Sequence, residues 1–102
     1  MTDGYELAAP GGTITVTPAA LTHLVVQAAE LADGARVRRP RRGLEIEVEG
    51  RRARVSLELA SRYGVPLPDL ARDVQARVAE ALQTMCGLEP DAIDVTVEEL
   101  DR

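Results

Sequence analysis

The chain has 102 residues and a mass of 11.0 kDa, the usual size of one domain, and its formal net charge is −5. It contains no Phe or Trp and only two Tyr, so its core must be aliphatic and it offers no aromatic platform for stacking bases. The acidic balance disfavours binding to nucleic acid or anionic lipid, and the single cysteine, Cys86, excludes an internal disulfide and a cysteine cluster for a metal.

Residues 1–11 are expected to form a flexible N-terminal tail, which ends at the Pro10-Gly11-Gly12 break. They lack the basic and apolar regions of a signal peptide, and no apolar run in the chain is long enough to span a bilayer. These features indicate a cytoplasmic protein that does not insert directly into a membrane and would reach one only through a partner.

Residues 13–17 alternate between polar and apolar side chains, which predicts a strand with Ile14 and Val16 facing the core. Thr17 can cap a following helix, and Pro18 suits its first position, where a missing N–H costs nothing. The helix is predicted to bury one apolar stripe and to end at Gly34. The stripe consists of Leu21, Leu24, Val25, Ala28, Leu31 and Ala32.

Residues 35–43 are predicted to form a loop, and a hairpin with the turn Gly50-Arg51 follows it. This turn places acidic residues opposite basic ones on one face and apolar residues opposite one another on the other face. The predicted pairs are Glu49 with Arg52, Glu47 with Arg54, Ile46 with Val55 and Leu44 with Leu57. Two independent patterns thus agree on one register.

A loop over residues 63–68 leads into a second predicted helix, which ends at Gly87. Asp73 and Arg77 have the i,i+4 spacing of an ion pair. Residues 92–98 alternate and predict a last strand. The buried stripe of this helix is predicted to be Leu70, Ala71, Val74, Val78, Ala81, Leu82 and Met85.

The order of elements predicts an α+β fold, a two-layer sandwich with the order β-α-β-β-α-β. Two helices should cover one face of a four-stranded mixed sheet, and the opposite face should be polar and solvated. The folded domain is expected over residues 12–99, with residues 100–102 as a short C-terminal tail.

The sharpest local feature is a run of arginines without an acidic residue among them. It consists of Arg36, Arg38, Arg39, Arg41 and Arg42. Five guanidinium groups on one loop could bind phosphates or an acidic partner surface. The alternative is a solvated basic loop, which is the more common role of a surface charge run.

Other candidate residues favour structural roles. His23 lies off the apolar stripe without a second metal ligand at a suitable spacing, so it is expected to be exposed and unligated. Cys86 has no candidate base nearby and is expected to be a small, partly buried thiol. Tyr63 is expected to pack at a strand end. No catalytic, cofactor-binding or metal-binding residues are therefore predicted, and the chain is not expected to be an enzyme.

The stretch 63–70, followed by Val74-Gln75 and by Met85-Cys86-Gly87-Leu88, resembles the signature of the alkaline shock protein family of bacterial envelope and general stress proteins. The opening at residues 12–18 is similar as well, and the resemblance covers about residues 12–98. In two respects the chain departs from the family, because its segment before the hairpin is compact and Cys86 replaces a small hydroxyl residue.

The resemblance implies a non-enzymatic stress protein without a cofactor that works through protein partners, among them a small membrane-anchored protein, and that forms homo-oligomers. A scaffold or adaptor role is the first hypothesis. The alternative is a nucleic-acid or phosphate binder that uses residues 36–42, although the net acidity of the chain makes nucleic acid an unlikely partner.

Overall fold

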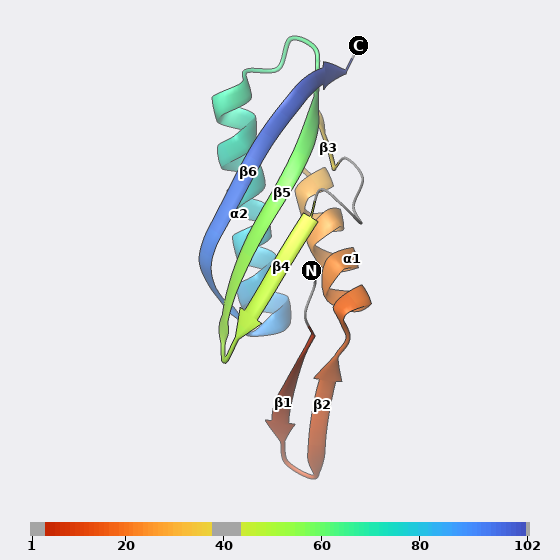
Figure 1. Ribbon diagram of the computed structural model, residues 1–102, viewed down its shortest axis with the longest axis vertical. Coiled ribbons are helices and arrows are strands. Elements are labelled where there is room, and N and C mark those ends of the chain that lie inside the picture. Colours follow the sequence, from red (N-terminus) through yellow and green to blue (C-terminus); the bar gives the residue numbers. More distant parts are fainter. Residues whose placement is uncertain (1–3, 38–43, 102) are drawn as a thin grey trace.

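A four-stranded sheet and two helices behind it form the body of the molecule (Figure 1). The structure, a computed structural model, describes residues 4–37 and 44–101. Its elements, in chain order, are β1 (Tyr5–Ala9), β2 (Gly12–Val16), α1 (Pro18–Glu30), β3 (Ala35–Val37), β4 (Leu44–Glu49), β5 (Arg52–Arg62), α2 (Leu67–Cys86) and β6 (Glu89–Asp101). The predicted α+β class, with two helices on one face of a mixed sheet, is confirmed.

The long strand β5 is the centre of the sheet. Its first half pairs antiparallel with β4 and its second half pairs antiparallel with β3, so these two strands share one edge of β5. Strand β6 lies along the other edge and runs parallel to β5, because α2 carries the chain back across the layer between them.

The predicted β4–β5 register is confirmed in all four pairs: Glu49 lies opposite Arg52, Glu47 opposite Arg54, Ile46 opposite Val55 and Leu44 opposite Leu57. Gly50 begins the turn with φ of 62°, a left-handed conformation that glycine adopts without strain.

The core between the two layers is aliphatic, as the composition predicts. Leu21 and Val25 from α1, Val74, Val78 and Leu82 from α2, and Val55, Leu57 and Leu59 from β5 are all at most 2% exposed. Thr17 caps α1 by accepting a hydrogen bond from the Ala20 N–H at 3.2 Å, and Gly87 ends α2 in a left-handed conformation. The predicted boundaries at Thr17 and Gly87 are thus confirmed, whereas α1 already ends at Glu30, before the predicted Gly34.

The predicted strand over residues 13–17 does not join the main sheet. It forms β2, which pairs with β1 in a separate two-stranded hairpin that extends away from the body (Figure 1). Only Thr17 separates β2 from α1, whereas a strand usually needs two to six residues to turn into a helix of the adjacent layer. Strand β2 therefore leads directly into α1, and Ile14, which was expected to face the core, is 53% exposed.

This hairpin also corrects the expectation of a flexible tail over residues 1–11, because β1 lies within that segment. Its apolar residues Tyr5 and Val16 pack against the core. Gly4 lies so close to the start of α1 that a Cβ there would be 2.9 Å from Pro18 Cδ and closer still to the Val16 carbonyl oxygen. The base of the hairpin is thus fixed to the body.

The fourth strand of the main sheet is β3, which lies inside the segment predicted to be a loop. Val37 is buried, and its N–H donates to Glu30 Oε2 at 3.0 Å. Three residues are too few for an alternating pattern to predict a strand, and β3 forms because the far half of β5 offers it an edge. At the other end of the chain β6 extends to Asp101, so most of the predicted C-terminal tail belongs to this strand.

Candidate interaction surfaces

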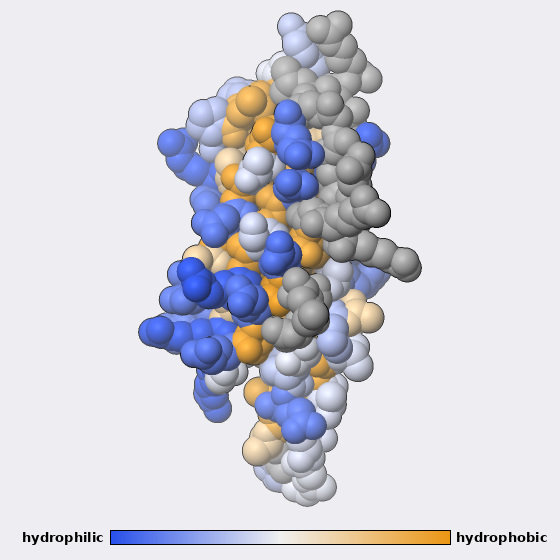
Figure 2. Space-filling model, viewed as in Figure 1, coloured by the Kyte–Doolittle hydropathy of each residue, from blue (hydrophilic) through white to orange (hydrophobic). Residues whose placement is uncertain are grey.

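The sheet face turned away from the helices is polar and mainly acidic. It carries Glu45, Glu47, Glu49, Glu58, Asp91 and Asp94 against Arg36, Arg52 and Arg54. A hollow of about 210 Å³ lies on it, lined by Glu45, Glu47, Arg54, Val55, Ser56 and Asp94. Figure 2 shows this face, with hydrophilic side chains gathered over the β4–β5 turn and the neighbouring end of β6.

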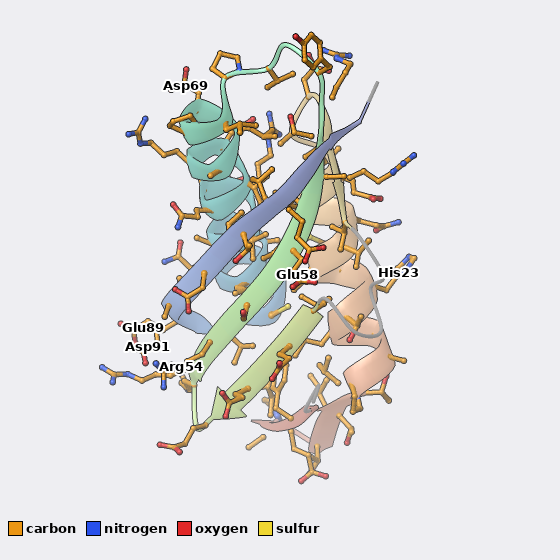
Figure 3. The ribbon with its side chains drawn as sticks, turned by 45° about the horizontal axis from the view of Figure 1, so that its top comes forward. His23, Arg54, Glu58, Asp69, Glu89 and Asp91 are labelled. Carbon is orange, nitrogen blue, oxygen red and sulfur yellow. The ribbon has the colours of Figure 1, made fainter. Side chains whose placement is uncertain are left out.

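The arginines of this face have an acidic partner that the hairpin register does not reveal. Arg52 and Arg54 lie 4.0 and 3.9 Å from the carboxylate of Asp91, which belongs to β6 (Figure 3). Their side chains are exposed, and pairs of this length at a surface contribute little to stability. The predicted Asp73–Arg77 pair on α2 is closer, with 3.0 Å between Arg77 Nε and Asp73 Oδ1.

Of the arginine run, the described residues include only Arg36. It is an exposed residue of β3, opposite Ala60 of β5. Arg38, Arg39, Arg41 and Arg42 lie outside the described residues. An anion-binding or partner-binding role for these five arginines therefore stays a prediction.

The other candidate residues of the sequence are His23, Cys86 and Tyr63. His23 is exposed on α1, as expected, and Figure 3 shows it far from the other labelled side chains. Cys86 is 8% exposed, in agreement with the expected partly buried thiol. Tyr63, which was expected to pack, is 61% exposed at the end of β5. Within residues 4–37 and 44–101, no three His, Cys, Asp or Glu side chains are grouped so that they could hold a metal ion.

One polar contact joins the hairpin to the far end of α2. The hydroxyl group of Tyr5 donates a hydrogen bond to the Cys86 carbonyl oxygen at 2.8 Å. Burial and this hydrogen bond raise the pKa of Tyr5 from 10.0 to about 12. The two residues are 81 positions apart, and no sequence pattern relates them.

A groove runs between the two helices on their outer side. We call it the helix groove, and it has a volume of about 210 Å³. Its lining consists of Leu24, Gln27, Ala28, Leu31, Arg77, Glu80, Ala81, Thr84 and Met85. Leu31 and Met85 were both predicted to be buried, yet they are 68% and 71% exposed.

The exposure of these two side chains follows from where they stand. Leu31 caps the end of α1 and Met85 lies in the last turn of α2, so each projects beside the small residues Ala28 and Ala81, which are nearly buried in the contact of the helices. Helical periodicity assigned both to the apolar side of their helices. It could not show how far the contact between the two helices extends along either of them.

The rim of the helix groove carries little net charge. Arg77 is paired with Asp73, Glu80 leaves one negative charge, and α1 contributes the uncharged Gln27. Among the described residues, no buried side-chain nitrogen or oxygen lacks a hydrogen-bond partner. In that same part of the chain no helix combines the length and the apolar character that crossing a membrane requires.

Comparisons with known proteins identify a family and a fold. Residues 22–102 match the model of the alkaline shock protein 23 family, which is described as having a cell envelope-related function. No curated protein sequence matches the chain.

Solved structures of the MamM CTD are similar in fold. A double variant has a TM-score of 0.65 and 18% identity, with 82% of this chain and 95% of that chain covered. A copper form of a single variant has a TM-score of 0.62 and 19% identity, with coverage of 79% and 95%. A cadmium form has a TM-score of 0.63 and 20% identity, with coverage of 79% and 94%. At these identities the likeness shows the fold alone.

Proposed function

Because this chain belongs to the alkaline shock protein 23 family, whose function is cell envelope-related, we propose that it is a non-enzymatic scaffold or adaptor that acts through protein contacts. In this role it would take part in the response to envelope stress. Its partners would include further copies of the chain and a protein anchored in the membrane, which would hold it at the membrane surface.

The observation that carries the proposal is the helix groove. Large apolar side chains that stay exposed in one groove mark contact surfaces, because their burial against a partner is favourable. Leu31 and Met85 line the same groove and are the two most exposed of the large apolar residues in the described part of the chain.

The metals named with the MamM CTD structures are not part of the proposal. Those forms contain copper or cadmium. In the described residues of this chain, the acidic side chains of the sheet face are not grouped with His or Cys into a set that could bind such an ion. What supports the scaffold role is the apolar groove together with the family.

The experiment that tests the proposal is retrieval of partners from the native host. Tagged full-length protein is captured from gently solubilised membranes and from the cytosol, with and without nuclease, and the bound proteins are identified and confirmed by reciprocal capture. We expect an integral membrane protein that is retained after nuclease treatment.

The matched control replaces Arg36, Arg38, Arg39, Arg41 and Arg42 by Ser. This variant should still retrieve the membrane protein. If nuclease removes the bound material, or if the Ser variant loses it, the scaffold proposal is wrong and the alternative, a nucleic-acid or phosphate binder, takes its place.

A further inference from the structure

We propose that the helix groove is a two-fold contact surface, and that its occupant is the helix groove of a second copy of this chain. The inference rests on the proposed scaffold function, because it names the partner of the same groove. The shape, the charge and the size of the helix face all fit such a contact.

The shape of the groove is complementary to itself. Helices α1 and α2 run in opposite directions (Figure 1), so Leu31 stands next to Arg77 at one end and Leu24 stands next to Met85 at the other. The two exposed apolar side chains, Leu31 and Met85, therefore occupy diagonally opposite corners. The other two corners hold the half-buried Leu24 and the aliphatic stem of Arg77.

A two-fold axis in the plane of the contact uses this diagonal arrangement. Whether the axis runs along the helices or across them, it brings the Leu31 and Met85 of the second copy over the corners at Leu24 and Arg77. Both copies then fill the space that the other leaves, with the small Ala28 and Ala81 between the protruding side chains. A patch that fits its own copy in this way is what a symmetric dimer requires.

The helix face and the sheet face differ in net charge, and this difference favours the helix face as the contact surface between two copies. The groove rim carries Arg77, its partner Asp73 and Glu80, so a second copy meets a net charge of only −1 there. The sheet face carries six acidic residues, Glu45, Glu47, Glu49, Glu58, Asp91 and Asp94, against Arg36, Arg52 and Arg54. Two copies would repel each other through that face, and charged edge strands oppose sheet-to-sheet pairing.

The size of the helix face is sufficient for a weak dimer. Helices of 13 and 20 residues are roughly 20 and 30 Å long, and side by side they are roughly 20 Å wide. Treated as flat, this face has an area of roughly 400–600 Å² per copy, which is close to the lower limit for a specific interface. The uneven surface of the side chains adds to this area. The large apolar side chains of the groove, Leu24, Leu31 and Met85, would then supply most of the affinity.

The test measures the mass of the purified full-length protein by analytical ultracentrifugation over a wide range of concentrations. We expect the wild-type chain to sediment at twice its mass of 11.0 kDa at high concentration and to dissociate on dilution. A double variant with Leu31→Lys and Met85→Lys should weaken the association about 30-fold or more, because it removes both protruding apolar contacts and places positive charge against Arg77.

Two further variants make the test specific to this groove. A matched double variant with Ile14→Lys and Leu67→Lys changes two exposed apolar residues outside the groove by the same charge, and it should still dimerise. An equimolar mixture of the double Lys variant with a variant carrying Leu31→Glu and Met85→Glu should form a two-chain species again, because side chains of opposite charge then occupy neighbouring corners of the contact. Circular dichroism establishes that each variant is folded.

The inference is overturned if the wild-type chain sediments as a single chain at every concentration, if the control variant dissociates as the groove variant does, or if the folded variants fail to associate when mixed. A failure of the scaffold proposal alone would give a different result. The purified protein would still dimerise through the groove, whereas capture from the host would retrieve no membrane protein.

Discussion

At the scale of single residues, the contact between Tyr5 and Cys86 combines two effects in one group. The phenol donates to a carbonyl oxygen at the end of α2, where the helix leaves its last carbonyl groups without partners of its own. Because the phenolate could not donate this hydrogen bond, the neutral form is favoured, and burial acts in the same direction. One side chain thus satisfies a helix end and attaches the hairpin to the body.

The raised pKa of Tyr5 predicts a loss of stability in alkaline solution. The unfolded chain releases the phenol proton near pH 10.0, while the folded chain keeps it up to about pH 12, so stability falls as the pH rises between these values. The chain has no Lys, and Arg titrates above this window, which leaves few other groups to contribute. Urea denaturation at successive pH values measures the effect.

The control for this prediction is Tyr5→Phe, which should lose about 1 kcal/mol of stability at neutral pH with the hydrogen bond and should show a weaker decline above pH 10. In a Tyr63→Phe variant, ultraviolet absorbance of tyrosinate reports Tyr5 alone and should give a midpoint near 12. A midpoint at the ordinary value would show that the hydroxyl group is free in solution.

At the scale of elements, the hairpin β1–β2 is the part of the molecule that depends most on one close contact. Its distal half, beyond Tyr5 and Val16, has little to pack against, and an isolated two-stranded hairpin is only marginally stable. The position of Gly4 against Val16 and Pro18 determines whether the hairpin stays aligned with α1.

Gly4→Ala should therefore release the hairpin without unfolding the body. The added Cβ would clash with the backbone of Val16 and with the Pro18 ring, and the chain can relieve the clash by moving β1. Amide hydrogen exchange should become faster in β1 and β2 and stay unchanged in β5. Gly12→Ala is the matched control, since nothing lies within 4 Å of its added Cβ, and it should leave exchange at the hairpin base as it is.

The elements that the sequence predicted correctly are those whose signals are local. The β4–β5 register follows from one turn and two agreeing patterns, and the caps at Thr17 and Gly87 are recognised within a few positions. The position of residues 13–17 was wrong because it depends on a connection too short to change layers. Strand β3 was missed because its pairing comes from β5, more than twenty residues further along the chain.

The same limit applied to the surfaces. Arg36 to Arg42 could be recognised as a charge run from the sequence alone, and four of these arginines lie outside the described residues. The helix groove could not be recognised, because Leu31 and Met85 belong to predicted buried stripes. Their exposure depends on how two distant helices pack against each other.

At the scale of the whole molecule, the net charge of −5 sets how association should respond to salt. Two copies repel each other at long range, while the groove that joins them is mainly apolar. Raising the ionic strength from about 0.01 M to about 0.15 M screens the repulsion, so the dimer should become a few-fold tighter.

This response distinguishes self-association from the binding of an anionic polymer, which weakens steeply with salt because condensed counterions are released on binding. Sedimentation equilibrium at several salt concentrations measures the former, and a titration with fluorescent oligonucleotide measures the latter. A dimer that dissociates as salt is added would mean that ion pairs hold it together, in contradiction to the apolar contact.

The hydrogen bond between Tyr5 and Cys86 also has a consequence for biosynthesis. The ribosome makes β1 before α2, yet the carbonyl group that accepts the Tyr5 hydrogen bond belongs to Cys86 at the end of α2. The central strand β5 likewise lacks its neighbour on one edge until β6 has been translated. A nascent chain released before that point would lack this hydrogen bond at its hairpin and would leave one edge of its central strand open.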